Sequence, residues 1–283
     1  DWQVNPDTLA YVTFSKGFKP GGFNPAINDS FPEDTPRIFG SENVDAIEVG
    51  FKATRLDGRM QLNGSFFQYD YKGLQIYKIL NNSSVNVNVD ADIMGAELEL
   101  LYIPAFDPDI VIDVMLSMLE TEAADNMLLD PKDRQQGDPN WIVLKGIDPG
   151  SATGVQYIAS LQGALGAAQI CGAFGACIPA PNTIYPNGIP AYMSRAFLGA
   201  IGVPTSDGIL TNIKGNALPN SPEQTFKIGI QKTWHALDAV DITARVDYYK
   251  QDESYAREFN RSWDLIPSWD QTNFSLLINN PDG

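Results

Sequence analysis

Apolar and polar residues alternate with a period of two in eight stretches of the chain. In one of them, Val49 and Phe51 alternate with Glu48 and Gly50. This period predicts β-strands with one apolar and one polar face. The predicted strands cover residues 9–18, 42–55, 55–77 (opening with an Asp-Gly turn), 90–102, 109–122, 224–234, 239–252 and 272–278. Their polar faces carry charged and amide groups, where the core of a soluble sheet would require apolar side chains.

The connections between these strands are short and long in strict alternation. The short ones cover residues 56–58, 103–108 and 235–238. The long ones cover residues 17–42, 73–89, 123–222 and 253–270. All tight turns would therefore lie at one end of an up-and-down sheet, as in transmembrane β-barrels. The alternative is a large soluble β-sandwich or β-helix, which would also alternate but does not require one-sided loop lengths.

The stretch 55–77 combines an apolar face with an aromatic end. About ten residues of a tilted strand cross a bilayer, and this stretch exceeds that length. We expect its apolar face to contact lipid and its polar face to line a wet or plugged lumen. We expect an interfacial girdle where the strand leaves the hydrocarbon, made of Phe66, Phe67, Tyr69 and Tyr71.

Composition and charge exclude several classes of function. With 35 acidic and 19 basic residues the net charge is −16, which argues against a nucleic-acid partner. One histidine, His235, and no CxxC motif leave a metal site without ligands, so we expect no metal and no cofactor. Glu97 and Glu99 would lie about 7 Å apart on one strand face, a separation found in inverting glycosidases. A water-facing wall explains them equally, and we expect no enzyme.

The two cysteines of the chain, Cys171 and Cys177, lie in a segment of Gly and Ala residues. In an oxidising compartment two cysteines this close could form a disulfide. The alternative is a pair of buried free thiols. The chain has no apolar run of the roughly 18 residues that a membrane helix requires.

Several longer motifs appear in a defined order. They are YVTFSKGFKPGGFN (11–24), SENVDAIEVGFKATRLDGRMQLNGSFFQYDYKGLQI (41–76), DADIMGAELEL (90–100), GNALPNSPEQTFKIGIQKTW (215–234) and DITARVDYYKQDESYAREFN (241–260). Together they resemble the barrel of TonB-dependent outer-membrane receptors over most of the chain, except about 123–213. The resemblance implies an all-β, antiparallel up-and-down transmembrane segment, about eight strands of a barrel of about 22.

Members of that family also have an N-terminal plug domain and a TonB box, and neither is visible in this sequence. We therefore expect residues 1–283 to be a partial barrel domain with a long extracellular loop at about 123–222, with the plug and the final strands absent. The resemblance implies an outer-membrane receptor of a Gram-negative bacterium. Its partners would be lipid, TonB through the missing N-terminal part, and a scarce ligand: a ferric siderophore, a cobalamin-like compound or an oligosaccharide. The alternatives are a passive porin-type channel and a secreted β-rich carbohydrate-binding or hydrolytic protein.

Two groups of residues are candidates for contacts with a plug or a solute. The polar face is expected to present Glu97, Glu99, Arg245 and Asp247 to the lumen. In the long loop, stretches 155–170 and 191–202 have helical spacing with small residues and predict short helices over the extracellular mouth. The candidate ligand contacts in or beside them are Trp141, Tyr157, Tyr192 and Arg195. The alternative is that these four pack the loop against itself.

Overall fold

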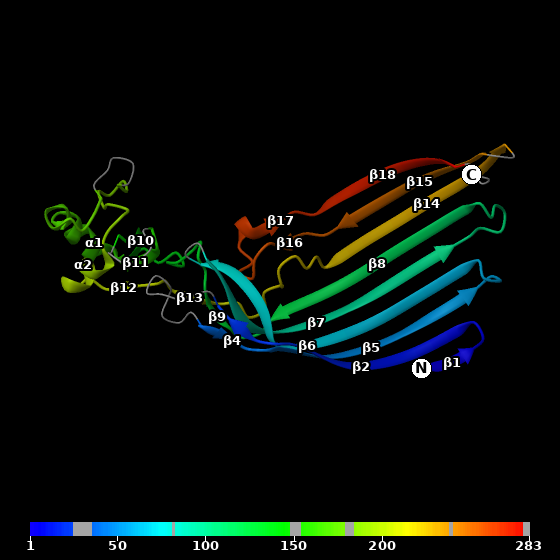
Figure 1. Ribbon diagram of the computed structural model, residues 1–283, viewed down its shortest axis with the longest axis horizontal. Helices are drawn as coiled ribbons and strands as arrows, with labels where there is room; N and C mark the ends of the chain where they lie inside the picture. The colour runs from blue at the N-terminus through cyan, green and yellow to red at the C-terminus, as the bar shows by residue number, and fades with distance from the viewer. Residues whose placement is uncertain (25–35, 81–82, 148–153, 179–183, 238–239, 280–283) are drawn as a thin grey trace.

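One long antiparallel sheet dominates the chain (Figure 1). The computed structural model describes residues 1–24, 36–80, 83–147, 154–178, 184–237 and 240–279. The strands, in their order across the sheet, are β1 (Trp2–Asn5), β2 (Thr8–Lys19), β5 (Glu42–Arg55), β6 (Met60–Leu80), β7 (Ser83–Tyr102), β8 (Ile110–Ala123), β14 (Gln224–Leu237), β15 (Val240–Gln251) and β18 (Trp269–Asn279). All eight predicted strands are confirmed, and β1 is an additional one. The sheet stays open, with β1 and β18 at its edges.

The connections divide between the two ends of the sheet, as the loop lengths predict. Strands β1, β5, β7 and β14 end at the same end of the sheet, on the right in Figure 1, which we call the short-turn end. The described residues of the remaining connections lie at the opposite end, the loop end. This one-sided arrangement is typical of transmembrane barrels.

The predicted loop at 73–89 is wrong, because β6 and β7 continue through it as a hairpin to Leu80 and Ser83. Its Asn residues suggest a turn, but they alternate with valines whose side chains are buried on one face, Val87 and Val89 among them. A register shift between Tyr71 and Leu74 separates this extension from the rest of the strand pair. Period two therefore outweighs the turn preference of Asn here.

Shorter elements fill the connections at the loop end. They are β3 (Gly22–Phe23), β4 (Ile38–Phe39), β9 (Met127–Leu129), β10 (Trp141–Lys145), β11 (Gln156–Ser160), α1 (Leu161–Ala168), η1 (Cys171–Phe174), α2 (Arg195–Ala200), β12 (Thr205–Ser206), β13 (Leu210–Asn212), β16 (Ser254–Tyr255), η3 (Ser262–Asp264) and β17 (Leu265–Ile266). Two helices form where they are predicted, but both are shorter than predicted. In the first stretch, β11 takes the residues that precede α1. Over the described ranges, every helix is too short to cross a membrane.

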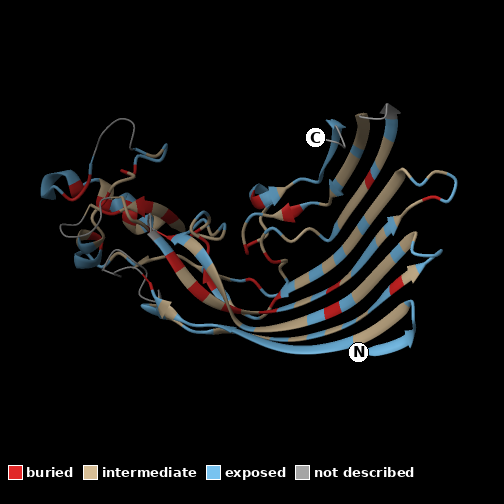
Figure 2. Cartoon of the chain, turned by 45° about the vertical axis from the view of Figure 1, so that its right-hand side comes forward, coloured by how far each residue is buried: buried red, intermediate tan, exposed pale blue. Residues whose placement is uncertain are grey.

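Residues 141–147, 154–178 and 184–206 form a separate lobe beyond the loop end, which we call the loop lobe (Figure 1). It has a three-stranded sheet, β10–β11–β12, and a hydrophobic core of its own. The fully buried side chains of this core include Leu144, Tyr157, Met193 and Leu198. In Figure 2 buried residues are dense in the loop lobe and at the loop end and sparse along the strands.

The long sheet has two chemically different faces. Register places large apolar side chains in line across adjacent strands, and most of them are exposed. This apolar face includes Val12, Phe14, Val49, Phe51, Phe66, Leu98, Met118, Ile230, Val246 and Phe274. The opposite, polar face carries charged and hydroxyl groups. An all-β, antiparallel segment of a barrel wall, as predicted, has this construction.

The predicted aromatic girdle is wrong for three of its four residues. Pairing of β6 with β5 and β7 runs without a shift from Met60 to Tyr71, so neighbouring residues alternate between the faces. Phe66 lies on the apolar face and is 51% exposed, whereas Phe67 lies on the polar face and is 8% exposed. The rings of Phe67 and Tyr69 stack with centroids 4.9 Å apart. Phe67 also covers Gly95 on β7, where a Cβ atom would collide with its ring.

Candidate functional site

The polar face of the long sheet brings together all four residues predicted to line a lumen. Strand register puts Glu97 and Glu99 of β7 on the same face as Arg245 and Asp247 of β15. The side chain of Asn63 on β6 donates a hydrogen bond to Glu99, with Nδ2 and Oε2 3.3 Å apart. The four residues therefore lie on one continuous polar surface that crosses the sheet.

Arg245 is the centre of an ionic network that spans three strands. Its Nε lies 2.9 Å from Asp247 Oδ2, and its Nη2 lies 2.6 Å from Oδ1 of Asp113 on β8. To reach Asp113 the guanidinium passes over Gly229 of β14, where a Cβ atom would collide with it. Lys227 Nζ lies 4.0 Å from Asp247. The absence of a side chain at Gly229 thus lets one arginine link β15 to β8.

Asp113 and Gly229 were not predicted from the sequence as parts of this network. Asp113 interrupts the apolar run 110–118, and its position in that run falls on the polar face. A single carboxylate within an apolar strand is a signal that could have marked it. Gly229 gave no signal, because its role depends on strand pairing.

A second polar contact lies near the other edge of the sheet. The hydroxyl of Tyr11 on β2 donates to Glu48 Oε1 on β5 at 2.6 Å. The Tyr11 ring covers Gly50, where a Cβ atom would lie 2.5 Å from it. Large side chains that lie across glycines of the next strand therefore recur on this face and hold its surface in defined positions.

His235 lies in β14 near the short-turn end, not in a turn. Its Nδ1 is 2.7 Å from Asp241 Oδ1, and its Nε2 is 3.4 Å from Asp109 Oδ1. No serine or cysteine nucleophile is bonded to it in the described residues. A search of the same residues finds no cluster of three or more His, Cys, Asp or Glu side chains that could hold a metal ion.

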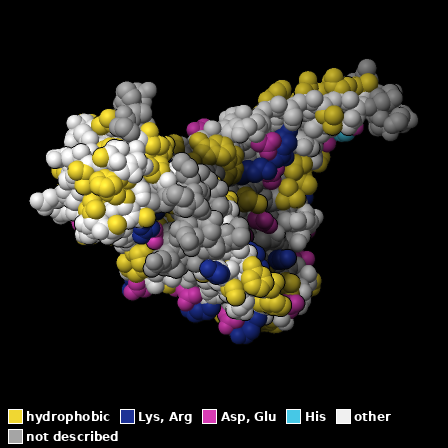
Figure 3. All heavy atoms as spheres, turned by 60° about the vertical axis from the view of Figure 1, so that its left-hand side comes forward, with side chains coloured by type: hydrophobic (Ala, Val, Ile, Leu, Met, Phe, Trp, Pro, Cys, Tyr) yellow, Lys and Arg dark blue, Asp and Glu magenta, His cyan; other side chains and the backbone are white. Residues whose placement is uncertain are grey.

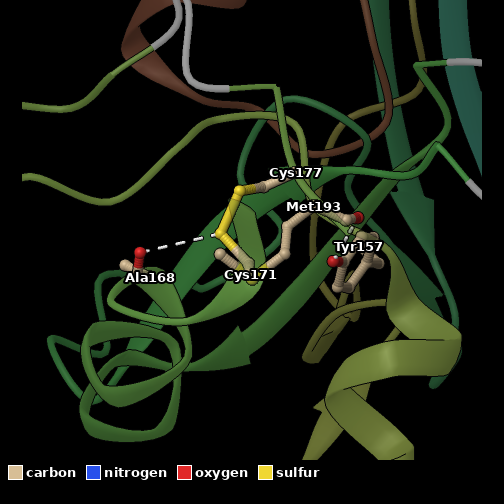
Figure 4. Close-up of a disulfide and its surroundings, with 5 residues drawn as sticks. All are labelled: Tyr157, Ala168, Cys171, Cys177 and Met193. Carbon is tan, nitrogen blue, oxygen red and sulfur yellow. Dashed lines mark hydrogen bonds between the residues drawn. A yellow bond between two sulfur atoms is a disulfide. The ribbon is translucent and has the colours of Figure 1, made fainter. Parts of the chain in front are cut away.

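The four loop candidates have different surroundings in the loop lobe. Tyr157 is 1% exposed, and its hydroxyl donates to the Met193 carbonyl at 2.8 Å (Figure 4). Tyr157 is therefore part of the lobe core. Arg195 Nη1 pairs with Asp207 Oδ1 at 2.6 Å, and its guanidinium lies 5.7 Å from the centre of the Tyr157 ring.

Trp141 and Tyr192 lie nearer the lobe surface. Both are half-buried, and the Lys145 ammonium lies 5.2 Å from the centre of the Tyr192 ring. Trp141 shares one face of β10 with Val143, because residues two apart on a strand point the same way.

Cys171 and Cys177 form a disulfide in the structure, with a sulfur–sulfur distance of 2.05 Å (Figure 4). Both cysteines belong to the buried core of the lobe, where they contact the region of Met193. The bond ties η1 to Cys177, which pairs with Met193 in an isolated β-bridge just before α2.

A buried ionic cluster joins the long loop to the loop between β15 and β18. Arg257 donates two hydrogen bonds to Asp264 and one to Asp130, each 2.8 Å long. Both carboxylates are fully buried. Burial opposes the charge of Arg257, but the bonds to Asp264 and Asp130 outweigh it and raise its pKa. We call Asp130, Arg257 and Asp264 the loop clasp, and no pattern in the sequence predicts it.

The open curved sheet, its two faces and its one-sided loops define a section of a transmembrane β-barrel wall. The family model for the TonB-dependent receptor-like β-barrel matches residues 1–280. The chain therefore belongs to the TonB-dependent receptor β-barrel family, and the resemblance noted in the sequence is confirmed.

Two solved structures share this fold. One is the ferric yersiniabactin uptake receptor FyuA from Yersinia pestis, with 13% identity and a TM-score of 0.52 over 96% of this chain. The other is BauA, the ferric preacinetobactin receptor from Acinetobacter baumannii, with 11% identity and a TM-score of 0.51 over 98% of this chain. The chain spans 28% of the length of each of them. At these identities the likeness establishes the fold alone.

Proposed function

We propose that this chain is part of the barrel wall of a Gram-negative outer-membrane receptor that imports a ferric chelate with energy delivered through TonB. The observation that carries the proposal is the family match over residues 1–280. The family consists of receptors and transporters, which agrees with the expectation that the protein is not an enzyme.

The two faces of the sheet support this role. The exposed apolar face suits contact with lipid acyl chains, and the polar face suits a lumen. Arg245, Asp247, Glu97 and Glu99 would then contact the plug or a passing solute. Because Asp113 and Asp247 hold Arg245 in one orientation, its guanidinium would be a fixed feature of the wall.

A ferric chelate is the first choice among the three ligand classes. Both solved neighbours are named as receptors for ferric chelates, and their fold is shared by this chain. A cobalamin-like compound or an oligosaccharide would use the same architecture. Of the loop candidates, Trp141 and Tyr192 are proposed ligand contacts, since Tyr157 and Arg195 serve the packing of the loop lobe.

The test uses a strain in which the full gene carrying this chain is deleted and then restored. Uptake of radioactive iron is measured from a panel of ferric chelates under iron limitation, with labelled cobalamin and oligosaccharides as further arms. We expect deletion to abolish uptake of at least one ferric chelate, and removal of TonB to do the same. Uptake that needs the gene but not TonB would support the passive channel instead. Unchanged uptake of every solute after deletion would overturn the proposal.

A further inference from the structure

A cavity of about 580 Å³ lies where three loop segments converge. One wall comes from the turn after β9, a second from the sheet of the loop lobe, and a third from η3. The lining residues are Pro131, Lys132, Arg134, Val143, Gln156 and Trp263. The cavity therefore lies at the junction that the loop clasp holds together.

Trp263 is an exposed aromatic residue on a firmly held backbone. Its side chain is 56% exposed, although its neighbour Asp264 is fully buried in the loop clasp. The backbone N–H of Ala256 also donates a hydrogen bond to the backbone carbonyl of Asp264. A tryptophan on a held backbone has only two side-chain torsions to lose on binding, and its indole offers a flat apolar surface.

The side chains that line the cavity differ in charge from the chain as a whole. Among the described residues, the cavity lining includes the cations Lys132 and Arg134 and no carboxylate, whereas the whole chain carries −16. The ammonium of Lys132 lies 3.7 Å from Asp264, and its side chain remains 60% exposed. Arg134 is buried and donates to the carbonyl of Asp207 at 2.7 Å. Arg134 therefore places a buried positive charge beside the cavity, close to the carboxylates of Asp207 and Asp130. The exposed Lys132 can reach a ligand directly.

The lobe wall adds groups suited to a planar ligand. Val143 supplies an apolar contact, and Gln156 supplies an amide that can donate and accept hydrogen bonds. Trp141, on the same face of β10 as Val143, extends this wall beyond the cavity.

We propose that this cavity binds an anionic ligand with aromatic rings, the chemistry of a ferric tris-catecholate. Trp263 stacks on a ring, and Lys132 pairs with the negative charge. The inference rests on the proposed function, since it names the class of chelate that the receptor takes.

The test uses the purified full-length protein that carries this chain, in detergent. The probes are a hexadentate ferric tris-catecholate, which is trianionic, and a hexadentate ferric trihydroxamate, which is neutral and has no aromatic ring. We expect only the tris-catecholate to bind. Trp263→Leu should weaken its binding about tenfold, as loss of one aromatic contact implies. Lys132→Gln should weaken it by about threefold to tenfold and reduce its dependence on salt.

Two matched variants serve as controls. Lys214→Gln removes an exposed lysine from the same long loop, and Phe174→Leu removes an exposed aromatic residue from the loop lobe. Both should bind the tris-catecholate within about twofold of the wild type. The proposed site is wrong if Trp263→Leu and Lys132→Gln bind the tris-catecholate as tightly as the wild type does. It is also wrong if the wild type does not bind the tris-catecholate.

The two proposals fail in different ways. If the receptor imports another ferric chelate and Trp263→Leu has no effect on that uptake, the cavity proposal is wrong and the transport proposal stands. If deletion of the gene changes no uptake, the transport proposal itself is wrong.

Discussion

The long sheet and the loop lobe treat their apolar side chains in opposite ways. In the sheet, large residues such as Phe14, Phe66 and Phe274 stand exposed in rows on one face. In the loop lobe, residues such as Leu144 and Met193 are fully buried among one another. The lobe thus buries its apolar side chains in a core of its own, whereas the sheet leaves a whole face of them exposed, the face that would contact lipid under the proposed function.

Charge follows the same division. Residues 149–206, which include most of the loop lobe, contain a single charged residue, Arg195. Figure 3 shows the loop lobe with mainly apolar and uncharged side chains, while blue and magenta side chains gather on the rest of the visible surface. The lobe is therefore held by packing and a disulfide, and the polar face of the sheet by ionic contacts.

The largest effect is expected at the loop clasp, which joins the long loop to the loop between β15 and β18. Arg257→Ala would remove the arginine that bonds both buried carboxylates, Asp130 and Asp264. Their remaining ion pairs, to Arg261 and Lys132, are longer, at 3.7 Å. Such a change costs about 3–5 kcal/mol of unfolding free energy. Urea unfolding of the full-length protein, followed by protease cleavage within the long loop, measures it. Arg37→Ala, at an exposed residue just before β4, is the control and should change little. Equal stability of the two variants would mean that the clasp does not hold the loops.

The next effect tests the two faces of the sheet directly. Met118 lies on the apolar face of β8 and the adjacent Ser117 on the polar face. Met118→Lys should cost about 2–4 kcal/mol in a bilayer, as a cation facing lipid does. Ser117→Lys should cost less than about 1 kcal/mol. Unfolding from lipid vesicles compares the two, and a larger loss for Ser117→Lys would contradict the assignment of the faces.

A smaller effect is expected inside the loop lobe. Replacing Cys171 and Cys177 by alanine removes a disulfide that closes a short loop, worth about 2 kcal/mol. The lobe should become more sensitive to protease while the strands of the sheet keep their protection. Reductant should reproduce this in the wild type and add nothing in the double variant. Equal sensitivity with and without the bond would show that packing alone holds the lobe.

The smallest effect is a pH dependence near the loop clasp. Burial raises the pKa of Glu258 above its ordinary value of 4.5. The folded protein therefore favours the protonated carboxyl, so this residue's contribution to stability is complete below pH 4.5 and is lost as pH rises through the raised pKa. Glu258→Gln should gain stability relative to the wild type between pH 4.5 and 7.

The exposed Glu253 provides the control for that titration. Glu253→Gln should follow the wild-type curve of unfolding temperature against pH. If the curve for Glu258→Gln runs parallel to that of the wild type, other interactions offset the cost of charging the buried carboxyl.

The strands were predictable because period two is a local property, visible in any window of the sequence. The same rule applied strictly would have separated Phe66 from Phe67, and it would have extended the strands through the Val/Asn alternation at 85–89. The loop clasp was not predictable, since Asp130 and Arg257 lie 127 residues apart. The Arg245 guanidinium lies over Gly229 only because β15 and β14 are neighbours in the sheet, which the local sequence pattern does not reveal. Pairing of distant segments, rather than local pattern, decided each of these sites.

The most direct test of the central claim is a scan of single cysteines along β8 in the full-length protein, folded in lipid vesicles. The two cysteines of this chain are bonded to each other, and any others in the full-length protein are replaced by alanine, so each introduced thiol can be labelled alone with a fluorophore. Labels at Val114, Leu116 and Met118 should be quenched by lipid-bound nitroxides, and labels at Asp113, Met115 and Ser117 by a water-soluble quencher. Quenching that fails to alternate, or that alternates in the opposite sense, would contradict a barrel wall whose apolar face meets lipid.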